Sequence, residues 1–364
     1  MKRKFTIYDF QFPILVFIFY YSLFTIHSSL SFASDTPLEE FPIPTPMSSP
    51  TDIAVDLDGV VWIMEYIANK IGRFDPSKNI FDEYEITTSK SESTNMAIDR
   101  ESNIWFTEQE GNQLGKFNTK TLKFEEFDLP MPDSNPASLT VDSKGNVYFV
   151  EWNRNKITKF SDGKRKFTRY DIPTAMSQPS GLAADAKDNI WFVEKGGGKL
   201  GMLNKETGKI KEYIIQPAFS LPIGTVIDSK GNVWFCKLKD KKLVKFNPAN
   251  GEFKDFTLPG AKGAQGMAIA KNDSIYLSMR YENKIVKFDI RSEIFTEYNI
   301  PTNDSQPLAV AVDTNGSVWF TMIAGNKIGK LDVSKMEKGA KGTELKVKIT
   351  LPDEIRQKGE KAKR

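Results

Sequence analysis

The strongest constraint on the fold is an aromatic residue that recurs every 42 or 43 positions. It stands in a short apolar run seven times, at Trp62, Trp105, Tyr148, Trp191, Trp234, Tyr276 and Trp319. A fixed period of this length is typical of repeat proteins, in which every repeat forms one small structural unit. The chain is therefore expected to contain seven copies of one unit.

Each unit contains four short runs that are rich in aromatic and β-branched residues. Examples are residues 53–56, 147–151, 155–160 and 124–130, and turns rich in Gly, Asp and Asn separate such runs. This pattern predicts an antiparallel meander of four strands, and no intervening segment is long enough for a helix. Repeated four-stranded units of about 40–50 residues form β-propellers. We therefore predict an all-β, seven-bladed β-propeller over residues 38–331.

The two ends of this region predict how the ring closes. The seventh unit supplies only three strands, whereas residues 38–44 match the pattern of a fourth strand. An N-terminal strand that completes the last blade would remove an open sheet edge. Residues 345–352 are the competing closing strand.

The N-terminus has the pattern of an export signal. Lys2, Arg3 and Lys4 precede an apolar stretch over residues 10–26, and small residues stand at 31 and 33. A secretory signal peptide cleaved after Ala33 has this form, and an uncleaved membrane anchor is the alternative. We expect an extracytoplasmic protein, secreted or associated with the envelope.

Charge gives few clues to a partner. The whole chain has 50 Lys and Arg against 47 Asp and Glu, a net charge of +3, which favours no nucleic-acid partner. Residues 332–364 form a basic tail, expected to be a solvated end, with a tether to an anionic envelope surface as the alternative. We expect a monomer whose membrane contact, if any, is through the tail or an uncleaved N-terminus.

Two rare residues exclude several kinds of site. Cys236 is the only cysteine, so no intrachain disulfide and no cysteine metal cluster can form. The only histidine is His27, which lies inside the predicted signal. A mature chain without imidazole can use neither a Ser-His-Asp nor a Cys-His pair, and no histidine base.

Recurring polar residues are expected at the blade ends. A carboxylate follows the aromatic by three residues at Glu65, Glu108, Glu151 and Glu194, on the face where blade-to-blade loops surround the channel mouth. These carboxylates could accept backbone hydrogen bonds, or could share a divalent ion such as Ca²⁺ or Mg²⁺. The Asn-Lys pairs that begin at Asn69, Asn155, Asn283 and Asn326 are expected to form turns, and the Asp residues ending the first strands to form hairpins.

Residues that break the repeat are the better candidates for ligand contact. They are Trp152, Arg154, Lys237, Arg280 and Tyr281. Together they offer aromatic surface and cationic donors, which suits a polar ligand with aromatic or sugar-like faces. The alternative is a solvated loop rim.

The recurring strings resemble the streptogramin B lyase, or virginiamycin B lyase, family. The likeness is clear at residues 104–108 (Ile-Trp-Phe-Thr-Glu), 295–302 and 326–330, and extends over about residues 38–331. The resemblance implies a seven-bladed propeller that opens a cyclic depsipeptide by elimination across its ester, with Mg²⁺ near the channel mouth.

The resemblance does not extend to the catalytic residues. In the family, a Glu-Pro-His-Gly string carries the general base, and here it is Gln306-Pro307-Leu308-Ala309. The position of the family's nearby Glu is Ile323, and that of its second His is Gln265. No catalytic residue is therefore expected by the family mechanism.

Three functions stay open from the sequence. The first is a noncatalytic binding module for a small molecule, a glycan or a peptide at the channel mouth. The second is a divalent-metal-dependent lyase or lactonase that uses Glu in place of His. The third is an envelope or protein-interaction scaffold.

Overall fold

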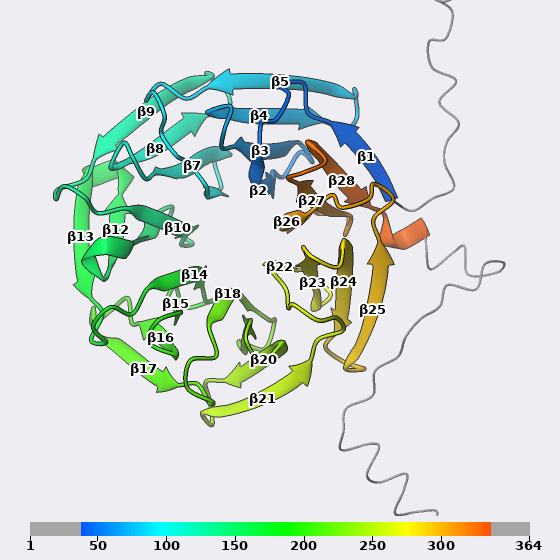
Figure 1. Ribbon diagram of the computed structural model, residues 1–364. Coiled ribbons are helices and arrows are strands. Elements are labelled where there is room, and N and C mark those ends of the chain that lie inside the picture. The colour runs from blue at the N-terminus through cyan, green and yellow to red at the C-terminus, as the bar shows by residue number, and fades with distance from the viewer. Residues whose placement is uncertain (1–37, 336–364) are drawn as a thin grey trace, which may run out of the picture. The chain divides into compact units, whose positions relative to one another are not determined.

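The computed structural model describes residues 38–335, which fold into seven four-stranded antiparallel sheets. The sheets stand in a ring about a central opening, and the first strand of each lies nearest the middle (Figure 1). This arrangement confirms the predicted seven-bladed β-propeller. The predicted signal and the tail beyond Lys335 lie outside the described residues. Among residues 38–335, no helix has the length and hydropathy needed to cross a bilayer.

We number the blades in chain order. Blade 1 consists of β2 (Pro50–Val55), β3 (Val61–Glu65), β4 (Lys70–Asp75) and β5 (Ile80–Glu85). Blade 2 consists of β6 (Met96–Ile98), β7 (Asn103–Glu108), β8 (Gln113–Asn118) and β9 (Lys123–Asp128). Blade 3 consists of β10 (Pro136–Val141), β11 (Val147–Glu151), β12 (Lys156–Ser161) and β13 (Lys166–Asp171), with short 3₁₀ helices η1 (Trp152–Arg154) and η2 (Asp162–Lys164) between strands. Blade 4 consists of β14 (Pro179–Ala184), β15 (Ile190–Glu194), β16 (Lys199–Leu203) and β17 (Ile210–Ile214).

The remaining blades follow the same order. Blade 5 consists of β18 (Pro222–Ile227), β19 (Val233–Lys237), β20 (Lys242–Asn247) and β21 (Glu252–Thr257). Blade 6 consists of β22 (Gly266–Ile269), β23 (Ser274–Met279), β24 (Lys284–Asp289) and β25 (Ile294–Asn299). Blade 7 consists of β26 (Pro307–Val312), β27 (Val318–Met322), β28 (Lys327–Leu331) and β1 (Leu38–Pro42).

The N-terminal strand closes the ring as predicted. β1 pairs antiparallel with β28, from Leu38 opposite Leu331 to Pro42 opposite Lys327. The Lys327 ammonium group also donates to the Glu40 carboxylate at 2.8 Å. β1 thus covers the edge of β28, which would otherwise be open to pairing with another chain.

The hydrophobic core lies between blades rather than within them. Every residue of β3, β11, β15, β19 and β27 is buried, because these second strands have side chains packed on both faces. One apolar cluster joins Trp62 and Met64 of blade 1 to Phe106 and Phe117 of blade 2, and similar clusters join other neighbouring blades. The recurring aromatic therefore packs each blade against the next.

The Asp residues that end the inner strands stabilise hairpins, as expected. In blade 1, one Asp56 oxygen accepts the backbone N–H groups of Asp58 and Val60, and the other accepts the Trp62 indole N–H at 2.9 Å. The same Asp–Trp bond recurs in four other blades. These carboxylates fix the turn on one face of the ring, which we call the bottom face.

Inner strands begin on the opposite face, which we call the top face. Pro50 at the start of β2 pairs with Glu65 at the end of β3, so the loops between second and third strands lie here with the blade-to-blade loops. Asn69, Asn155, Asn283 and Asn326 adopt positive φ of 50–56°, which confirms their predicted turn role. Their side-chain amides also bond the next blade-to-blade loop, as Asn69 does to the Thr88 carbonyl and the Ser91 hydroxyl.

A second repeated contact links consecutive blades at the top face. Thr45 donates its N–H and its hydroxyl to the Glu83 carboxylate, at 2.9 and 2.6 Å. Thr174 with Glu212, and Thr302 with Glu40, repeat the pair. In each case the Thr follows the last strand of one blade and the Glu lies on the last strand of the next, so the bond holds neighbouring blades together.

Candidate functional site

The four recurring carboxylates lie at the top ends of their second strands but do not meet. Glu65, Glu108, Glu151 and Glu194 are all fully buried, each within a different blade. Glu65 lies over Gly72 of its own blade, where an added Cβ would be 2.5 Å from Oε1. No three potential metal-ligating side chains cluster anywhere in residues 38–335. The structure therefore does not bring these carboxylates to one shared metal ion.

In blades 1, 2 and 4 the buried carboxyl faces a second carboxylate on the fourth strand. Burial, with the nearby charges of Glu83 and Glu212, raises the pKa of Glu65 and of Glu194 to about 7. Burial likewise raises the pKa of Glu108 to about 7. No hydrogen bond of good geometry reaches their oxygens, although weaker polar interactions with Ser48, Thr88 and Thr174 partly offset the burial. These three groups therefore exchange protons near neutral pH.

The facing carboxylates of blades 1 and 4 have pKa values shifted in the opposite direction. Burial alone would raise the pKa of Glu83, but hydrogen bonds from Thr45 and Lys70 bring it below its usual value. Thr174 and Lys199 lower the pKa of Glu212 in the same manner. Each pair thus combines one ionised carboxylate with one carboxyl that readily keeps its proton.

Blades 3 and 5 replace this pair by an ion pair. Glu151 accepts hydrogen bonds from the Arg169 guanidinium and, at 2.9 Å, from the Ser134 hydroxyl. In blade 5, Lys237 donates to Asp255 at 2.6 Å and to the Gln216 carbonyl at 2.9 Å. Contrary to the expectation from sequence, Lys237 is only 2% exposed and does not present its ammonium group to the mouth.

The other predicted ligand contacts lie at the top face but on separate blades. Trp152 in η1 is 43% exposed and Tyr281 is 57% exposed, on blades 3 and 6, which lie across the ring from each other. Arg154 donates to the Pro132 carbonyl and thereby holds its own loop. Arg280 donates to the Gln306 side-chain oxygen at 2.8 Å and lies over the Tyr281 ring. The structure therefore does not combine these side chains into one ligand-binding cluster.

The family's catalytic positions do come together, at a cavity of about 330 Å³ on the top side of the channel. Gln265 and Leu308 both line this cavity. Ile323 donates its backbone N–H to the Gln306 carbonyl at 3.3 Å, which joins the other two positions. At these four positions the chain has amide and alkyl side chains.

Blades 1 and 2 contribute polar groups that sequence reasoning missed. Asp52, Thr51, Thr94 and Asn95 line the same cavity from the inner strands and their leading loops. Asp52 accepts the backbone N–H of Met96 at 2.8 Å, and burial raises its pKa to about 6. The signal in the sequence was the residue ten positions before each recurring aromatic, which is Asp52 in blade 1 and Asn95 in blade 2 but Gly or Ala in blades 4 to 7.

Two of these small residues, Gly181 and Gly266, lie where neighbouring inner strands approach each other closely. An added Cβ would lie 2.9 Å from the Gly224 Cα at Gly181, and 2.1 Å from the Leu308 carbonyl oxygen at Gly266. Neighbouring inner strands therefore touch through backbone between blades 4 and 5 and between blades 6 and 7, and a side chain does not fit at Gly181 or Gly266. The polar cavity is left against blades 1, 2, 6 and 7.

A family model matches the chain over residues 30–218 and 123–338, and its description is the virginiamycin B lyase family. The chain belongs to the virginiamycin B lyase family. The cavity is lined by Gln265 and Leu308, two of the positions that the sequence resemblance assigns to the family's catalytic residues. A comparison with curated protein sequences finds no match.

Solved structures of the virginiamycin B lyase family superpose on most of the chain. A streptogramin B lyase structure is 29% identical, with a TM-score of 0.76, and covers 80% of this chain and 96% of its own. Virginiamycin B lyase from Staphylococcus aureus is 26% identical, with a TM-score of 0.75, and covers 80% and 98%. An extracellular domain of a putative one-component system from B. thetaiotaomicron is 12% identical, with a TM-score of 0.66, and covers 81% and 39%, so it shares the fold.

Proposed function

We propose that this protein is a noncatalytic binding module, which takes a small molecule, a glycan or a peptide at its top-face mouth. The observation that carries the proposal is the 330 Å³ cavity, which is lined by Leu308 and Gln265 at positions that the sequence resemblance assigns to the family's catalytic residues. Ligand cavities commonly span about 300–1,000 Å³, so this one suits a small ligand or one group of a larger ligand.

The lining supports hydrogen bonding to a ligand. Asn95 and Gln265 offer amides, Thr51 and Thr94 offer hydroxyls, and Asp52 is the only ionisable side chain of the cavity. Met267 and Leu308 add apolar surface. A ligand with amide or hydroxyl groups beside a hydrocarbon surface matches this mixture.

Exposed apolar side chains around the mouth support a ligand that extends beyond the cavity. On the blade-to-blade loops, Met47 is 79% exposed, Met176 is 84% exposed and Phe219 is 70% exposed. Trp152 and Tyr281 are also exposed, on top-face loops of blades 3 and 6. Large apolar side chains gathered on one face are typical of interaction sites.

The replaced residues support binding without turnover. Elimination requires a group that removes a proton, and neither the Leu308 alkyl chain nor the Gln265 and Gln306 amides do this near neutral pH. The only histidine of the chain is His27, which lies outside the described residues. For the metal-dependent alternative, residues 38–335 supply no cluster of three ligands, so we rank it below binding.

Location belongs to the same proposal. We propose an extracytoplasmic protein on the strength of the residue pattern in 1–33. Expression of the full chain with a reporter, followed by cell fractionation and N-terminal sequencing, tests whether the chain is exported and cleaved after Ala33.

Quinupristin is a suitable first ligand, because an inactive virginiamycin B lyase from Staphylococcus aureus has been solved with it. We expect saturable binding by calorimetry with no ring opening during incubation. Because elimination leaves the mass unchanged, chromatography is the assay for an opened ring. Gln265→Leu and Trp152→Ala should weaken binding, whereas Leu122→Ala, at an exposed apolar residue away from the mouth, should not.

Two results would contradict the proposal. Enzymatic opening of quinupristin, well above the spontaneous rate, would overturn the noncatalytic assignment. Binding that is unchanged in both mouth variants would place the ligand elsewhere.

A further inference from the structure

A second cavity lies on the bottom face, away from the family's site. It measures about 540 Å³ and opens at the channel end where the inner strands of blades 1 to 4 finish. Val55, Ile98, Val141 and Ala184 form an apolar wall, each from the end of one inner strand. Nothing in the proposed top-face function uses this space.

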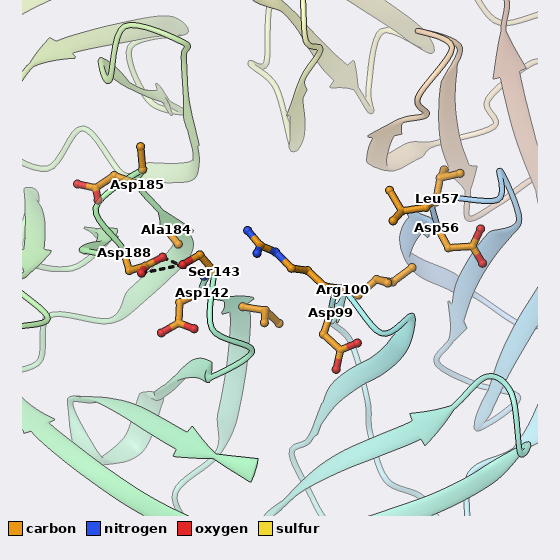
Figure 2. Close-up of a pocket in the computed structure, with 13 residues that line it drawn as sticks. Asp56, Leu57, Asp99, Arg100, Asp142, Ser143, Ala184, Asp185 and Asp188 are labelled. Atoms are coloured by element: carbon orange, nitrogen blue, oxygen red, sulfur yellow. Dashed lines mark hydrogen bonds between the residues drawn. The ribbon is translucent and has the colours of Figure 1, made fainter. Parts of the chain in front are cut away.

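One side chain in this cavity has no partner. Arg100 follows Asp99 at the end of the blade 2 inner strand and is exposed. Figure 2 shows its guanidinium pointing into the open centre of the cavity, away from Asp56 and Asp99 and toward the side where Ser143 and Asp188 lie. Within residues 38–335 it makes no hydrogen bond, ion pair or ring contact, although a guanidinium carries five donors.

The surrounding carboxylates are already occupied. Asp99 accepts two backbone N–H groups, the Asn103 amide and the Trp105 indole. Asp188 accepts the Ser143 N–H and hydroxyl at 2.9 Å and the Lys205 ammonium group at 2.8 Å. Asp56, Asp142 and Asp185 are likewise bonded to their own turns. None of them is therefore oriented to neutralise Arg100.

Lysines add positive charge around the same opening. Lys144, Lys187, Lys230 and Lys271 stand on the bottom-face turns of blades 3, 4, 5 and 6, and all four are exposed. Asp58 and Glu101 are the exposed acidic residues on the corresponding turns of blades 1 and 2. The turns of blades 3 to 6 also carry carboxylates, but these are buried or half-buried: Asp142, Asp185, Asp188, Asp228 and Asp273. The exposed charges on those four turns are therefore the lysines, which favours approach of an anion to this side of the rim.

We propose that the bottom-face cavity is a second binding site, which takes a small organic carboxylate with an apolar body. Arg100 would pair with the carboxylate in a bidentate manner, and the apolar wall would cover the hydrocarbon part. The site is separate from the top-face cavity, whose only ionisable side chain is the Asp52 carboxylate.

The test uses two ligands that differ only in charge. N-acetylphenylalanine carries a carboxylate, whereas N-acetylphenylalanine amide is neutral with the same apolar body. We expect the full-length protein to bind the acid saturably by calorimetry, at least about tenfold more tightly than the amide, since a charge-assisted pair is lost. Inorganic phosphate, an anion without an apolar body, should bind more weakly than the acid.

Arg100→Gln should weaken binding of the acid about tenfold to hundredfold and leave the amide unchanged. Because Arg100 has no partner, this variant should keep the wild-type unfolding temperature, which separates loss of the site from loss of the fold. Arg291→Gln, at another exposed arginine, is the matched control and should bind as wild type does. Equal binding of acid and amide, no saturable binding of the acid, or wild-type binding by Arg100→Gln would each overturn the proposal.

Discussion

The three buried carboxyls that face a second carboxylate predict that the protein loses stability as pH rises from 5 to 8. Glu65, Glu108 and Glu194 have pKa values raised from 4.5 to about 7 in the folded chain. A raised carboxyl pKa means that the folded state holds a proton which the unfolded chain releases. The associated stability is fully present below about pH 4.5 and is lost as pH rises through about 7.

The size of the effect follows from the shift. One pKa unit corresponds to about 1.4 kcal/mol. Ionising each of the three carboxyls, whose pKa rises from 4.5 to about 7, therefore lowers the free energy of unfolding by up to about 3 kcal/mol at pH 8. Asp52, with a pKa of about 6, acts in the same direction. No imidazole in residues 38–335 obscures the measurement, because the only histidine is His27.

Glu194→Gln tests the reasoning, since the amide imitates the protonated carboxyl. We expect this variant to match the wild type within about 1 kcal/mol at pH 5 and to exceed its free energy of unfolding by about 1–3 kcal/mol at pH 8. Denaturant unfolding at both pH values gives the comparison. Combining Glu65→Gln, Glu108→Gln and Glu194→Gln should remove most of the fall in stability between pH 5 and 8 and leave the smaller part that comes from Asp52.

Glu151→Gln is the matched control, because it changes the same strand position in blade 3. There the carboxylate pairs with Arg169, so its loss leaves a largely buried guanidinium without its partner. This variant should lose about 2–4 kcal/mol at both pH values. A wild-type stability that is constant or rises from pH 5 to 8, or a Glu194→Gln variant less stable than wild type at pH 8, would refute the reasoning.

Three further predictions concern the frame around the sites. Asp228→Ala should lower the free energy of unfolding by about 2–4 kcal/mol in denaturant titration, because the turn N–H groups and the Trp234 indole lose their acceptor. Gly266→Ala should lower the melting temperature in calorimetry and alter the top cavity, because the new Cβ would lie 2.1 Å from the Leu308 carbonyl oxygen. Deleting residues 38–42 should expose the edge of β28 and produce aggregates in size-exclusion chromatography, whereas a chain that starts at residue 34 should stay monodisperse.

The fold was predictable from sequence because the repeat is local and regular. The 43-residue spacing of Trp62 and its counterparts set the number of blades, and the four runs per unit set the strands. Even ring closure was visible, since residues 38–42 have the alternation of a fourth strand that blade 7 lacks. The strands of each blade could be predicted from residues close together in the chain, and ring closure from the missing fourth strand of the last unit.

The site was much less predictable, because it depends on partners that are distant in sequence. Lys237 was expected at the mouth, but Asp255, 18 residues later, holds it inside the blade. Glu65 was expected to accept backbone hydrogen bonds or to share a metal ion, but its oxygens accept no hydrogen bond of good geometry and it faces Glu83 of its own sheet. Nothing in the sequence indicates which polar residue is already paired, and so Asp52 and Arg100 appeared as candidates only when their surroundings were known.

The pairing of β1 with β28 also determines when the ring can be completed during synthesis. Glu40 and Lys327, which bond across this pair, are 287 residues apart. β1 therefore cannot pair with β28 until nearly the whole propeller has been synthesised. At about 5–20 residues per second, the ribosome needs roughly 15–60 s to supply the missing neighbour. Blades 1 to 6 can pack in succession during that interval, but the seventh forms only after Leu331 has left the exit tunnel.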